Sequence, residues 1–174
     1  MSLLLEEEPQ TERLPDHYEV VNGEIVELPP MSTLASEVAN LINDELGAYT
    51  RATNLGRNRV EMLFHIPLPD DESRNRKPDV SFIKYDRWPK DRPIAYRENA
   101  ADLVPELAVE VASPSDEVED LFLKAQEYLQ GGVRLVWLVM PKLRDLCVFS
   151  RIAISSSNIH CDRYSDRRRR APWL

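Results

Sequence analysis

The sequence predicts one α/β domain with a mixed central sheet, helices on the faces of that sheet and an N-terminal β-hairpin. The near-continuous apolar run at 107–112 is typical of a central strand that is buried on both faces. An amphipathic segment and a second apolar run at 133–140 follow it, at the length of a right-handed βαβ crossover. A chain of 174 residues has the size of one domain and can bury a sizeable core.

The N-terminal part of the chain has the pattern of a hairpin followed by a helix. Apolar–polar alternation on both sides of Asn22-Gly23 predicts a hairpin over 18–28, because this dipeptide favours a type I′ turn. A helix is predicted over 32–49, with Ser32 or Thr33 as its N-cap. The apolar stripe of this helix consists of Leu34, Val38, Leu41, Ile42, Leu46 and Tyr49.

The remainder alternates between short strands, loops and one further helix. We expect the second helix to begin after Ser113, in a capping box with Asp116, and to end at Gly131-Gly132. Its inward residues are predicted to be Val118, Leu121, Phe122, Ala125 and Leu129. The other segments are a loop at 51–60, a strand at 60–68, a charged turn at 69–77, a strand at 79–85, a surface loop at 86–104 and a last strand at 146–149.

Composition and charge divide the chain and exclude several classes of protein. We expect a flexible arm at 1–14, the α/β domain at 15–150 and an atypical tail at 151–174, disordered or frame-shifted, with six Arg against two Asp. The net charge of −8 leaves no global basic field for nonspecific binding of nucleic acid. No apolar stretch is long enough to span a membrane, there is no signal peptide, and two cysteines are too few for a disulfide framework. These features favour a cytoplasmic protein with no membrane partner.

Glu110 is the strongest single candidate for chemistry, because it is the one charge in the run 107–112. A buried carboxylate costs several kcal/mol unless it is paired, protonated or bound to a cation. Asp79, at the start of another strand, and Lys124, in the helix after Glu110, are the candidate partners. Two carboxylates and a lysine suit Mg²⁺, which can activate water and polarise phosphorus. The lysine would orient or deprotonate the water, or stabilise developing charge.

These residues carry a resemblance to a known group of proteins. Pro78-Asp79, then Glu110 in an apolar strand, then a nearby lysine resemble the PD-(D/E)XK nuclease superfamily. The similarity is closer to one bacterial branch of putative restriction endonucleases, long labelled a domain of unknown function, and it covers about 16–150. The segments that match this branch are Tyr18-Glu19, Gly23-Glu24, Pro78-Asp79-Val80, Glu110-Val111, Ser113-Pro114-Ser115, Asp120, Lys124, Tyr128, Gly132-Val133, Trp137-Leu138-Val139 and Pro141.

The resemblance implies a restriction-endonuclease-like fold and Mg²⁺-dependent, or Mn²⁺-dependent, hydrolysis of nucleic acid. DNA is the expected partner, and a homodimer is the expected assembly. The implied metal ligands are Asp79, Glu110 and the backbone carbonyl of Val111, with Lys124 positioning the water. The superfamily usually places its lysine two residues after the acid, where this chain has Ala112, so the lysine has migrated to Lys124. Additional candidates for the site are Glu37, Asp120 and Tyr128.

Structural explanations stand beside these expectations. Glu110 and Lys124 can form a purely structural ion pair, and Asp120 with Lys124 has the i, i+4 spacing of a surface helix pair. A basic group of residues is either a phosphate-binding cleft or a solvated loop: Arg51, Arg57, Arg59, Arg74, Arg76 and Lys77. The rival function is a catalytically inactive binding or accessory module that keeps the nuclease fold. A glycosidase acid–base pair is disfavoured by the aromatic content of 7%.

Overall fold

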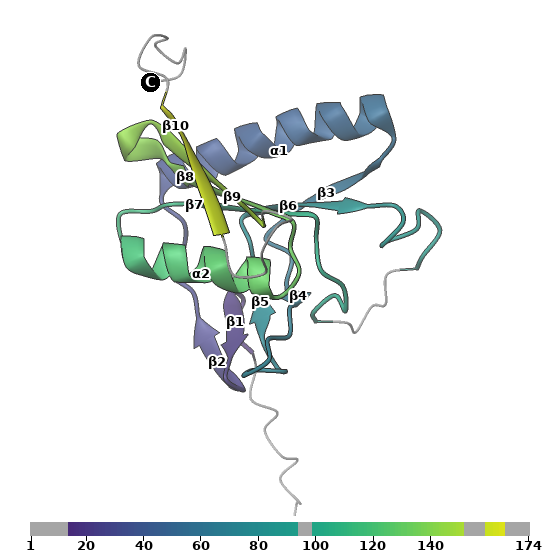
Figure 1. Ribbon diagram of the computed structural model, residues 1–174, viewed down its shortest axis with the longest axis horizontal. Helices are drawn as coiled ribbons and strands as arrows, with labels where there is room; N and C mark the ends of the chain where they lie inside the picture. The colour runs from purple at the N-terminus through teal and green to yellow at the C-terminus, as the bar shows by residue number, and fades with distance from the viewer. Residues whose placement is uncertain (1–13, 94–98, 152–158, 166–174) are drawn as a thin grey trace, which may run out of the picture.

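The computed structural model describes residues 14–93, 99–151 and 159–165. Within these residues the chain forms two helices and two sheets (Figure 1). The elements are β1 (Tyr18–Val21), β2 (Glu24–Glu27), α1 (Thr33–Thr53), β3 (Gly56–Val60), β4 (Phe64–His65), β5 (Asn75–Arg76), β6 (Val80–Lys84), β7 (Leu107–Val111), α2 (Val118–Gln130), β8 (Leu135–Met140), a 3₁₀ turn (Pro141–Leu143), β9 (Asp145–Arg151) and β10 (Ile159–Ser165).

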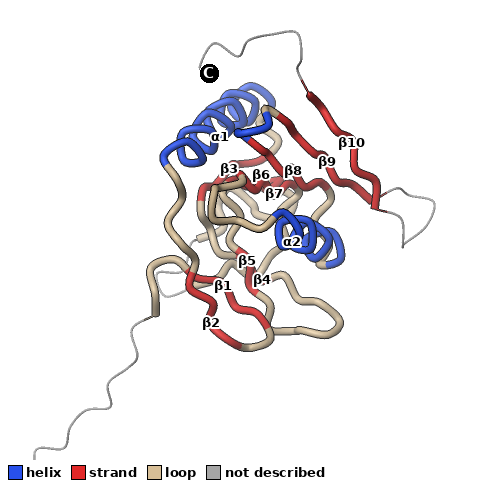
Figure 2. Tube along the Cα trace, turned by 90° about the vertical axis from the view of Figure 1, so that its left-hand side faces the viewer, coloured by secondary structure: helices blue, strands red, loops and turns tan. Residues whose placement is uncertain are grey.

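The larger sheet has the strand order β10-β9-β8-β7-β6-β3, and its one parallel pair is β7 with β8. α2 connects these two strands, which confirms the predicted βαβ crossover. All five residues of β7 are buried, as expected for a central strand. Figure 2 shows α1 on one face of this sheet and α2 on the other. The predicted mixed sheet with flanking helices is therefore confirmed.

The smaller sheet has the order β2-β1-β5-β4 and lies on the α2 side of the larger one (Figure 2). Its first two strands form the predicted hairpin. Asn22 and Gly23 have φ values of 53° and 78°, the left-handed conformation that a type I′ turn requires. Val20 in β1 pairs with Asn75 in β5, so the hairpin is joined to the segment that leads into β6.

α1 begins where the sequence predicts and ends later. The Ser32 side chain accepts a hydrogen bond from the backbone N–H of Ala35 at 3.2 Å, which confirms this N-cap. The helix continues past Gly47 to Thr53, and Asn54 ends it in the left-handed conformation. Ala35, Ala39, Gly47 and Thr50 form its buried face, whereas Leu34 and Tyr49 of the predicted stripe are exposed. Small residues let this helix approach the sheet closely, so the predicted inward stripe is partly wrong.

The N-cap of α2 lies four residues after the predicted N-cap, Ser113. The Ser113 backbone N–H donates to the Asp116 carboxylate at 2.6 Å, and this turn precedes the helix rather than capping it. Glu117 is the N-cap, and Gly131 ends the helix as predicted. Val118 of the predicted inward set is exposed, whereas Leu121, Ala125 and Leu129 are buried.

Several short strands differ from the sequence-based prediction. The predicted loop at 51–60 contains the end of α1 and the edge strand β3, which pairs with β6. The predicted strand at 60–68 is interrupted at Glu61, where φ is 46°, and retains only β4. The predicted charged turn at 69–77 contains β5.

The C-terminal edge of the larger sheet also extends further than predicted. The last expected strand, at 146–149, is longer, and β10 then pairs with β9 in antiparallel register from Ile159↔Arg151 to Ser165↔Asp145. β10 lies within the segment that the sequence analysis set apart as a tail. The rest of that tail after Arg151, and the predicted arm before Leu14, fall outside the described residues.

Two apolar clusters pack against opposite faces of the larger sheet. The cluster on the α1 face is built from residues such as Ala35, Val80 and Val109. The cluster on the α2 face is larger and includes Tyr128 and Leu138. No helix among the described residues is both long and apolar enough to cross a membrane.

Candidate active site

Asp79 directly precedes β6, and Glu110 lies in the neighbouring strand β7. β6 and β7 are antiparallel with Val80 paired to Val109, and continuing this register by one residue places Asp79 opposite Glu110. Side chains of directly opposed residues stand about 5 Å apart at Cβ. Because side chains alternate along a strand, both carboxylates project to the face that α2 covers, away from α1. The structure thus brings together the two acids that the sequence singled out.

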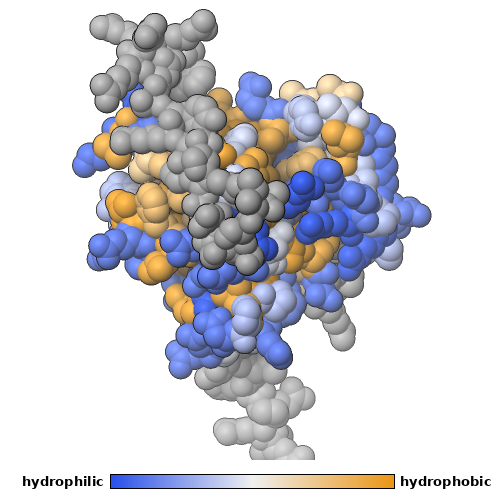
Figure 3. Space-filling model, in the orientation of Figure 1, coloured by the Kyte–Doolittle hydropathy of each residue, from blue (hydrophilic) through white to orange (hydrophobic). Residues whose placement is uncertain are grey.

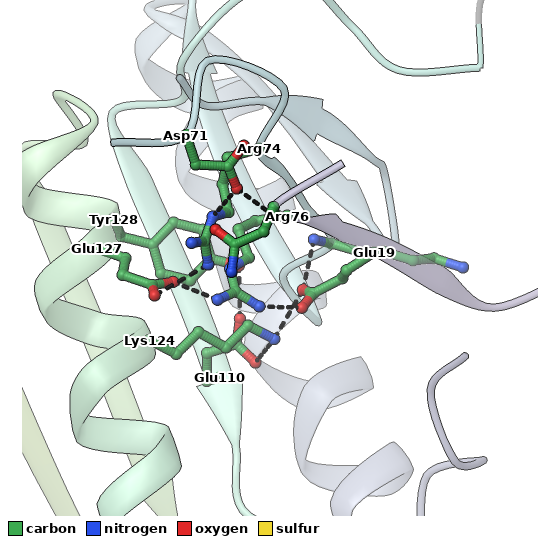
Figure 4. Close-up of polar contacts among 10 residues, drawn as sticks. Glu19, Asp71, Arg74, Arg76, Glu110, Lys124, Glu127 and Tyr128 are labelled. Carbon is green, nitrogen blue, oxygen red and sulfur yellow. Dashed lines mark hydrogen bonds and ion pairs between the residues drawn. The ribbon is translucent and has the colours of Figure 1, made fainter. Parts of the chain in front are cut away.

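α2 supplies two partners for Glu110 (Figure 4). The Lys124 ammonium donates to one Glu110 oxygen at 3.1 Å, and the Tyr128 hydroxyl donates to the other at 2.6 Å. Lys124 and Tyr128 are one helical turn apart, so one face of α2 presents both groups to the same carboxylate. The Glu110 residue is only 5% exposed and Tyr128 is fully buried. The structure therefore places Lys124 in direct contact with Glu110.

The hairpin provides a third group that the sequence analysis quoted without a role. Glu19 in β1 is only 2% exposed, and its carboxylate lies 2.9 Å from the Lys124 ammonium. The same carboxylate contacts the Arg76 guanidinium at 2.5 Å and accepts the backbone N–H of Lys77 at 2.8 Å. The available signal was its place beside Tyr18 in the matching segment, but only the tertiary structure shows that it holds the lysine.

The ion pairs continue from Glu19 along the smaller sheet (Figure 4). Arg76 also contacts Glu127 of α2. Arg74 lies 2.9 Å from Glu127 and 2.8 Å from Asp71. This chain of alternating charges joins the smaller sheet to α2, and it uses Arg74 and Arg76, which the sequence analysis considered for a phosphate-binding cleft.

The pKa values of Asp79 and Glu110 are governed by burial, whereas those of Glu19 and Lys124 are governed by neighbouring charges. Burial raises the pKa of Glu110 to about 7 and the pKa of Asp79 to about 6, in spite of the nearby Lys124. Burial alone would lower the pKa of Lys124, but Glu110 and Glu19 outweigh it and raise that pKa. Burial would raise the pKa of Glu19, but Lys124 and Arg76 outweigh it and lower that pKa. The lysine is therefore a permanent cation, whereas the Asp79–Glu110 pair carries a charge that burial disfavours.

The connected ion pairs of the described residues contain more carboxylates than cations. The connected acids are Asp71, Glu127, Glu19, Glu110 and the opposed Asp79, and the connected cations are Arg74, Arg76 and Lys124. Five carboxylates face three cations, so the fully ionised cluster has a net charge of −2. The excess lies at the Asp79–Glu110 end, where two further carboxylates, Glu61 and Asp116, add to the negative potential at Asp79.

Pro78 and Val111 shape the backbone beside the acids. The Val111 N–H donates to an Asp79 carboxylate oxygen at 2.6 Å, which fixes Asp79 against the end of β7. Continuing the β6–β7 register places Pro78 opposite Val111. Proline has no N–H, so Pro78 cannot donate a ladder hydrogen bond to the Val111 carbonyl.

Other predicted candidates lie outside this group. Glu37 is exposed on α1, which packs on the opposite face of the sheet. Asp120 is exposed in the first turn of α2, and the Lys124 ion pairs among the described residues are with Glu110 and Glu19 instead. Of the remaining basic residues, Arg51 is exposed near the end of α1, Lys77 lies 3.0 Å from His17, and Arg57 and Arg59 lie on β3.

Comparisons with known proteins agree with this fold. The family model described as Uma2, putative restriction endonuclease, matches residues 6–160. Among solved structures, the chain is similar to a putative nuclease of DUF820 from Anabaena variabilis ATCC 29413, with a TM-score of 0.67 and 17% identity. The alignment covers 83% of this chain and 75% of that one, and at this identity it shows the shared fold. A search of curated proteins finds no match.

Proposed function

From the premise that this chain belongs to the Uma2 family of putative restriction endonucleases, we propose that it is a metal-dependent endonuclease that hydrolyses phosphodiester bonds of DNA. The observation that carries the proposal is the placement of Asp79, directly before β6, beside Glu110 of β7, with Lys124 hydrogen-bonded to Glu110. In this proposal the protein acts in the cytoplasm, and two copies cut the two strands of a duplex.

The donor set suits a hard divalent cation. Among the described residues there is no group of three or more His, Cys, Asp or Glu side chains placed to hold a metal. Mg²⁺ takes one or two carboxylates and keeps several waters, so such a group is not required for it. Asp79 and Glu110 would hold Mg²⁺ or Mn²⁺, whose charge would balance the excess of −2 in the ionised cluster.

The Val111 carbonyl is the proposed third protein ligand. Pro78 leaves this carbonyl without a ladder donor from the opposing strand, and the Val111 N–H is already directed to Asp79. A bound Mg²⁺ would supply Lewis-acid polarisation of the phosphate and a lowered pKa of a coordinated water. In this proposal an available backbone oxygen thus lies at the same strand end as the two acids.

Lys124 acts in this proposal as a fixed cation rather than as a base. Glu110 and Glu19 hold it protonated, so it orients the attacking water and stabilises negative charge that develops on the phosphate. The Tyr128 hydroxyl donates a hydrogen bond to Glu110 and thereby orients that carboxylate. Glu19 keeps the lysine ammonium in place from the opposite side.

A non-catalytic binding or accessory module is the alternative, and one observation favours it. Both oxygens of Glu110 already accept hydrogen bonds from protein donors, Lys124 and Tyr128. A carboxylate satisfied in this way can be a structural ion pair, and the same fold would then only bind its partner. Metal binding and turnover separate the two functions.

The proposal is tested by cleavage of plasmid and single-stranded DNA with Mg²⁺ or Mn²⁺ against EDTA. We expect Asp79→Asn and Glu110→Gln to lose both cleavage and metal binding by calorimetry. Lys124→Gln is expected to lower turnover by about 10²-fold or more and to keep metal binding, since one preorganised charge contributes on that scale. Glu37→Gln and Asp120→Asn remove exposed acids that lie away from the pair and serve as matched controls.

Either of two results would count against the nuclease. Metal-dependent cutting that survives in Asp79→Asn would come from a contaminant or from another site. Intact metal binding with no cutting of any nucleic acid by the wild type would favour the accessory module.

A further inference from the structure

Basic and aromatic side chains alternate beside the edge strand β3. The Arg57 guanidinium carbon lies 4.8 Å from the Trp88 ring centroid and 5.2 Å from that of Tyr85. Arg59 lies 5.3 Å from the Trp88 ring, and the Lys90 ammonium lies 4.8 Å from the Tyr85 ring. We call this group of five residues the cation–aromatic ladder. The two rings hold three cations at separations typical of cation–π contacts.

The cations of the ladder lack carboxylate partners among the described residues. Arg57 donates to the Pro89 carbonyl at 3.2 Å, and Arg59 donates to the neighbouring Asn58 carbonyl at 2.7 Å. Lys90 donates to the side-chain amide oxygen of Asn54. All three partners are neutral, in contrast to Arg74, Arg76 and Arg87, each of which pairs with a carboxylate.

Two arginines held together without a counter-charge are electrostatically costly. Burial and the neighbouring Arg57 lower the pKa of Arg59. Two N–H groups of the ladder, Arg57 Nε and Trp88 Nε1, are also buried without a hydrogen-bond partner in the described part of the chain. An anionic ligand could neutralise this positive charge and accept hydrogen bonds from these N–H groups.

The ladder lies on the same face of the sheet as the acids. β3 pairs with β6 so that Arg59 is opposite Ser81 and Arg57 is opposite Ile83. Ser81 follows Asp79 by two residues, which places Arg59 about 7 Å further along the strand direction and Arg57 about 7 Å beyond it. Figure 3 shows that hydrophilic residues dominate the edge of the molecule where the segment after β6 lies.

One cavity is lined both by residues near the acids and by a residue of the ladder. Its volume is about 280 Å³, and its lining includes Glu61 and Lys77 near the acids together with Trp88 and Arg92. Glu61 is itself one of the groups whose charge acts on Asp79. Glu61, whose charge acts on Asp79, and Trp88 of the ladder therefore line the same cavity.

We propose that the cation–aromatic ladder binds the phosphate backbone of the nucleic acid next to the bond that is cut. The inference rests on the proposed function in taking the ligand to be nucleic acid and in placing the cut at the acids, whereas binding of the backbone by the ladder is tested without cleavage. Arg57 and Arg59 leave the backbone of β3 about 7 Å apart, which is about twice the 3.4 Å rise per nucleotide of a duplex strand, so successive cations can follow a ligand with regularly repeating negative charge. Contacts of this kind position a nucleic-acid strand without reading its base sequence.

The test measures binding without metal, so that it does not depend on cleavage. Fluorescein-labelled DNA, as single strand and as duplex, is titrated in EDTA at several salt concentrations, and binding is followed by anisotropy. Arg57→Gln with Arg59→Gln is expected to weaken binding about tenfold or more and to reduce the slope of log K against log salt by about 2. Lys90→Gln, a change at an exposed side chain, is expected to reduce the slope by about 1.

The controls separate charge from folding and from overall net charge. Arg57→Lys with Arg59→Lys keeps both charges and is expected to keep the wild-type salt slope. Arg134→Gln with Arg144→Gln removes the same charge from exposed positions before β8 and β9 and is expected to bind like the wild type. If the double Gln variant at the ladder does not fold, Lys90→Gln alone decides the outcome.

Three results would overturn the inference: unchanged affinity and slope in the ladder variants, equal weakening in the Arg134 and Arg144 control, or binding of polyaspartate as tight as that of DNA. Loss of binding in the ladder variants of a protein that never cuts DNA would support the ladder and overturn only the nuclease proposal.

Discussion

At the scale of single residues, the site depends on two carboxyl groups that burial makes reluctant to ionise. Asp79 and Glu110 face each other, and burial raises the pKa of Asp79 to about 6 and that of Glu110 to about 7. Glu19 differs because two cations, Lys124 and Arg76, contact it, whereas the ion pair of Glu110 among the described residues is with Lys124. Two buried glutamates therefore differ in charge state, because the second cation lowers the pKa of Glu19 while burial raises that of Glu110.

Asp79→Asn is expected to stabilise the metal-free protein at neutral pH. An acid whose pKa is raised in the folded state binds protons more tightly there, so it lowers stability as pH rises from about 4 to about 6. The variant lacks this penalty and should gain about 1–2 kcal/mol at pH 8 in EDTA, since Asp79 is partly exposed and the full shift overstates the effect. Urea unfolding at a series of pH values measures the difference.

The difference between Asp79→Asn and the wild type should shrink towards pH 4, where both folded states are neutral at this position. Asp120→Asn, a change of an exposed acid on α2, is expected to show no such pH-dependent gain. A variant that is less stable than the wild type at pH 8 would mean that neighbouring cations, and not burial, govern Asp79.

At the scale of elements, the site is a junction between β6, β7, α2 and the hairpin. α2 contributes Lys124 and Tyr128 to Glu110 from one face, so the height of this helix over the sheet sets both contacts. Its end is fixed by close packing, because a Cβ added at Gly131 would lie 2.2 Å from a methyl carbon of the buried Ile66. Gly131 has an ordinary helical φ of −71°, so space and not backbone strain excludes a side chain.

Gly131→Ala is therefore expected to destabilise the protein by about 1–3 kcal/mol, the usual cost of overpacking. Ile66→Ala removes the contacting methyl and should cost about 2–5 kcal/mol on its own. The double variant should cost less than the sum of the two changes, and denaturant unfolding of the four proteins measures this coupling. Strict additivity would show that the helix end moves away freely.

Elements also show how far the sequence determines the structure. The hairpin and the βαβ unit were predictable because Asn22-Gly23 and the apolar run of β7 are local signals. β3 was not, because Arg57 and Arg59 give it no apolar alternation, and its pairing with β6 is a tertiary contact. The pair of acids and Lys124 could be predicted from order along the chain. The contact between Glu19 and Lys124 could not, since it is a tertiary contact between β1 of the smaller sheet and α2.

At the scale of the whole molecule, charge is distributed unevenly. The net charge of the chain is −8, yet the three cations of the ladder at one edge lack carboxylate partners among the described residues. The acidic excess of the cluster around Asp79 lies beside this edge on the same sheet face. An acidic protein can therefore still present a local basic surface to a polyanion, provided that a cation offsets the carboxylates next to it.

Mg²⁺ is expected to stabilise the folded molecule through the acid pair. A ligand that binds only the folded state at 100 times its Kd adds about 2.7 kcal/mol, which for a chain of this size raises Tm by roughly 5–10 °C. Thermal unfolding with Mg²⁺ against EDTA measures this shift. Glu37→Gln should keep the shift and Asp79→Asn should lose it. An equal shift in both variants would place the metal elsewhere.

The contact between Glu19 and Lys124 has a consequence for synthesis of the protein. The hairpin leaves the ribosome before α2, and α2 leaves it after β3, β6 and β7 of the larger sheet have been made. Until the helix emerges, Glu19 has no lysine to hold and Glu110 has neither of its donors. The nascent chain thus carries an incomplete site until α2 has been made. On the proposed function, a chain interrupted before α2 would lack Lys124 and Tyr128 and would not cut DNA.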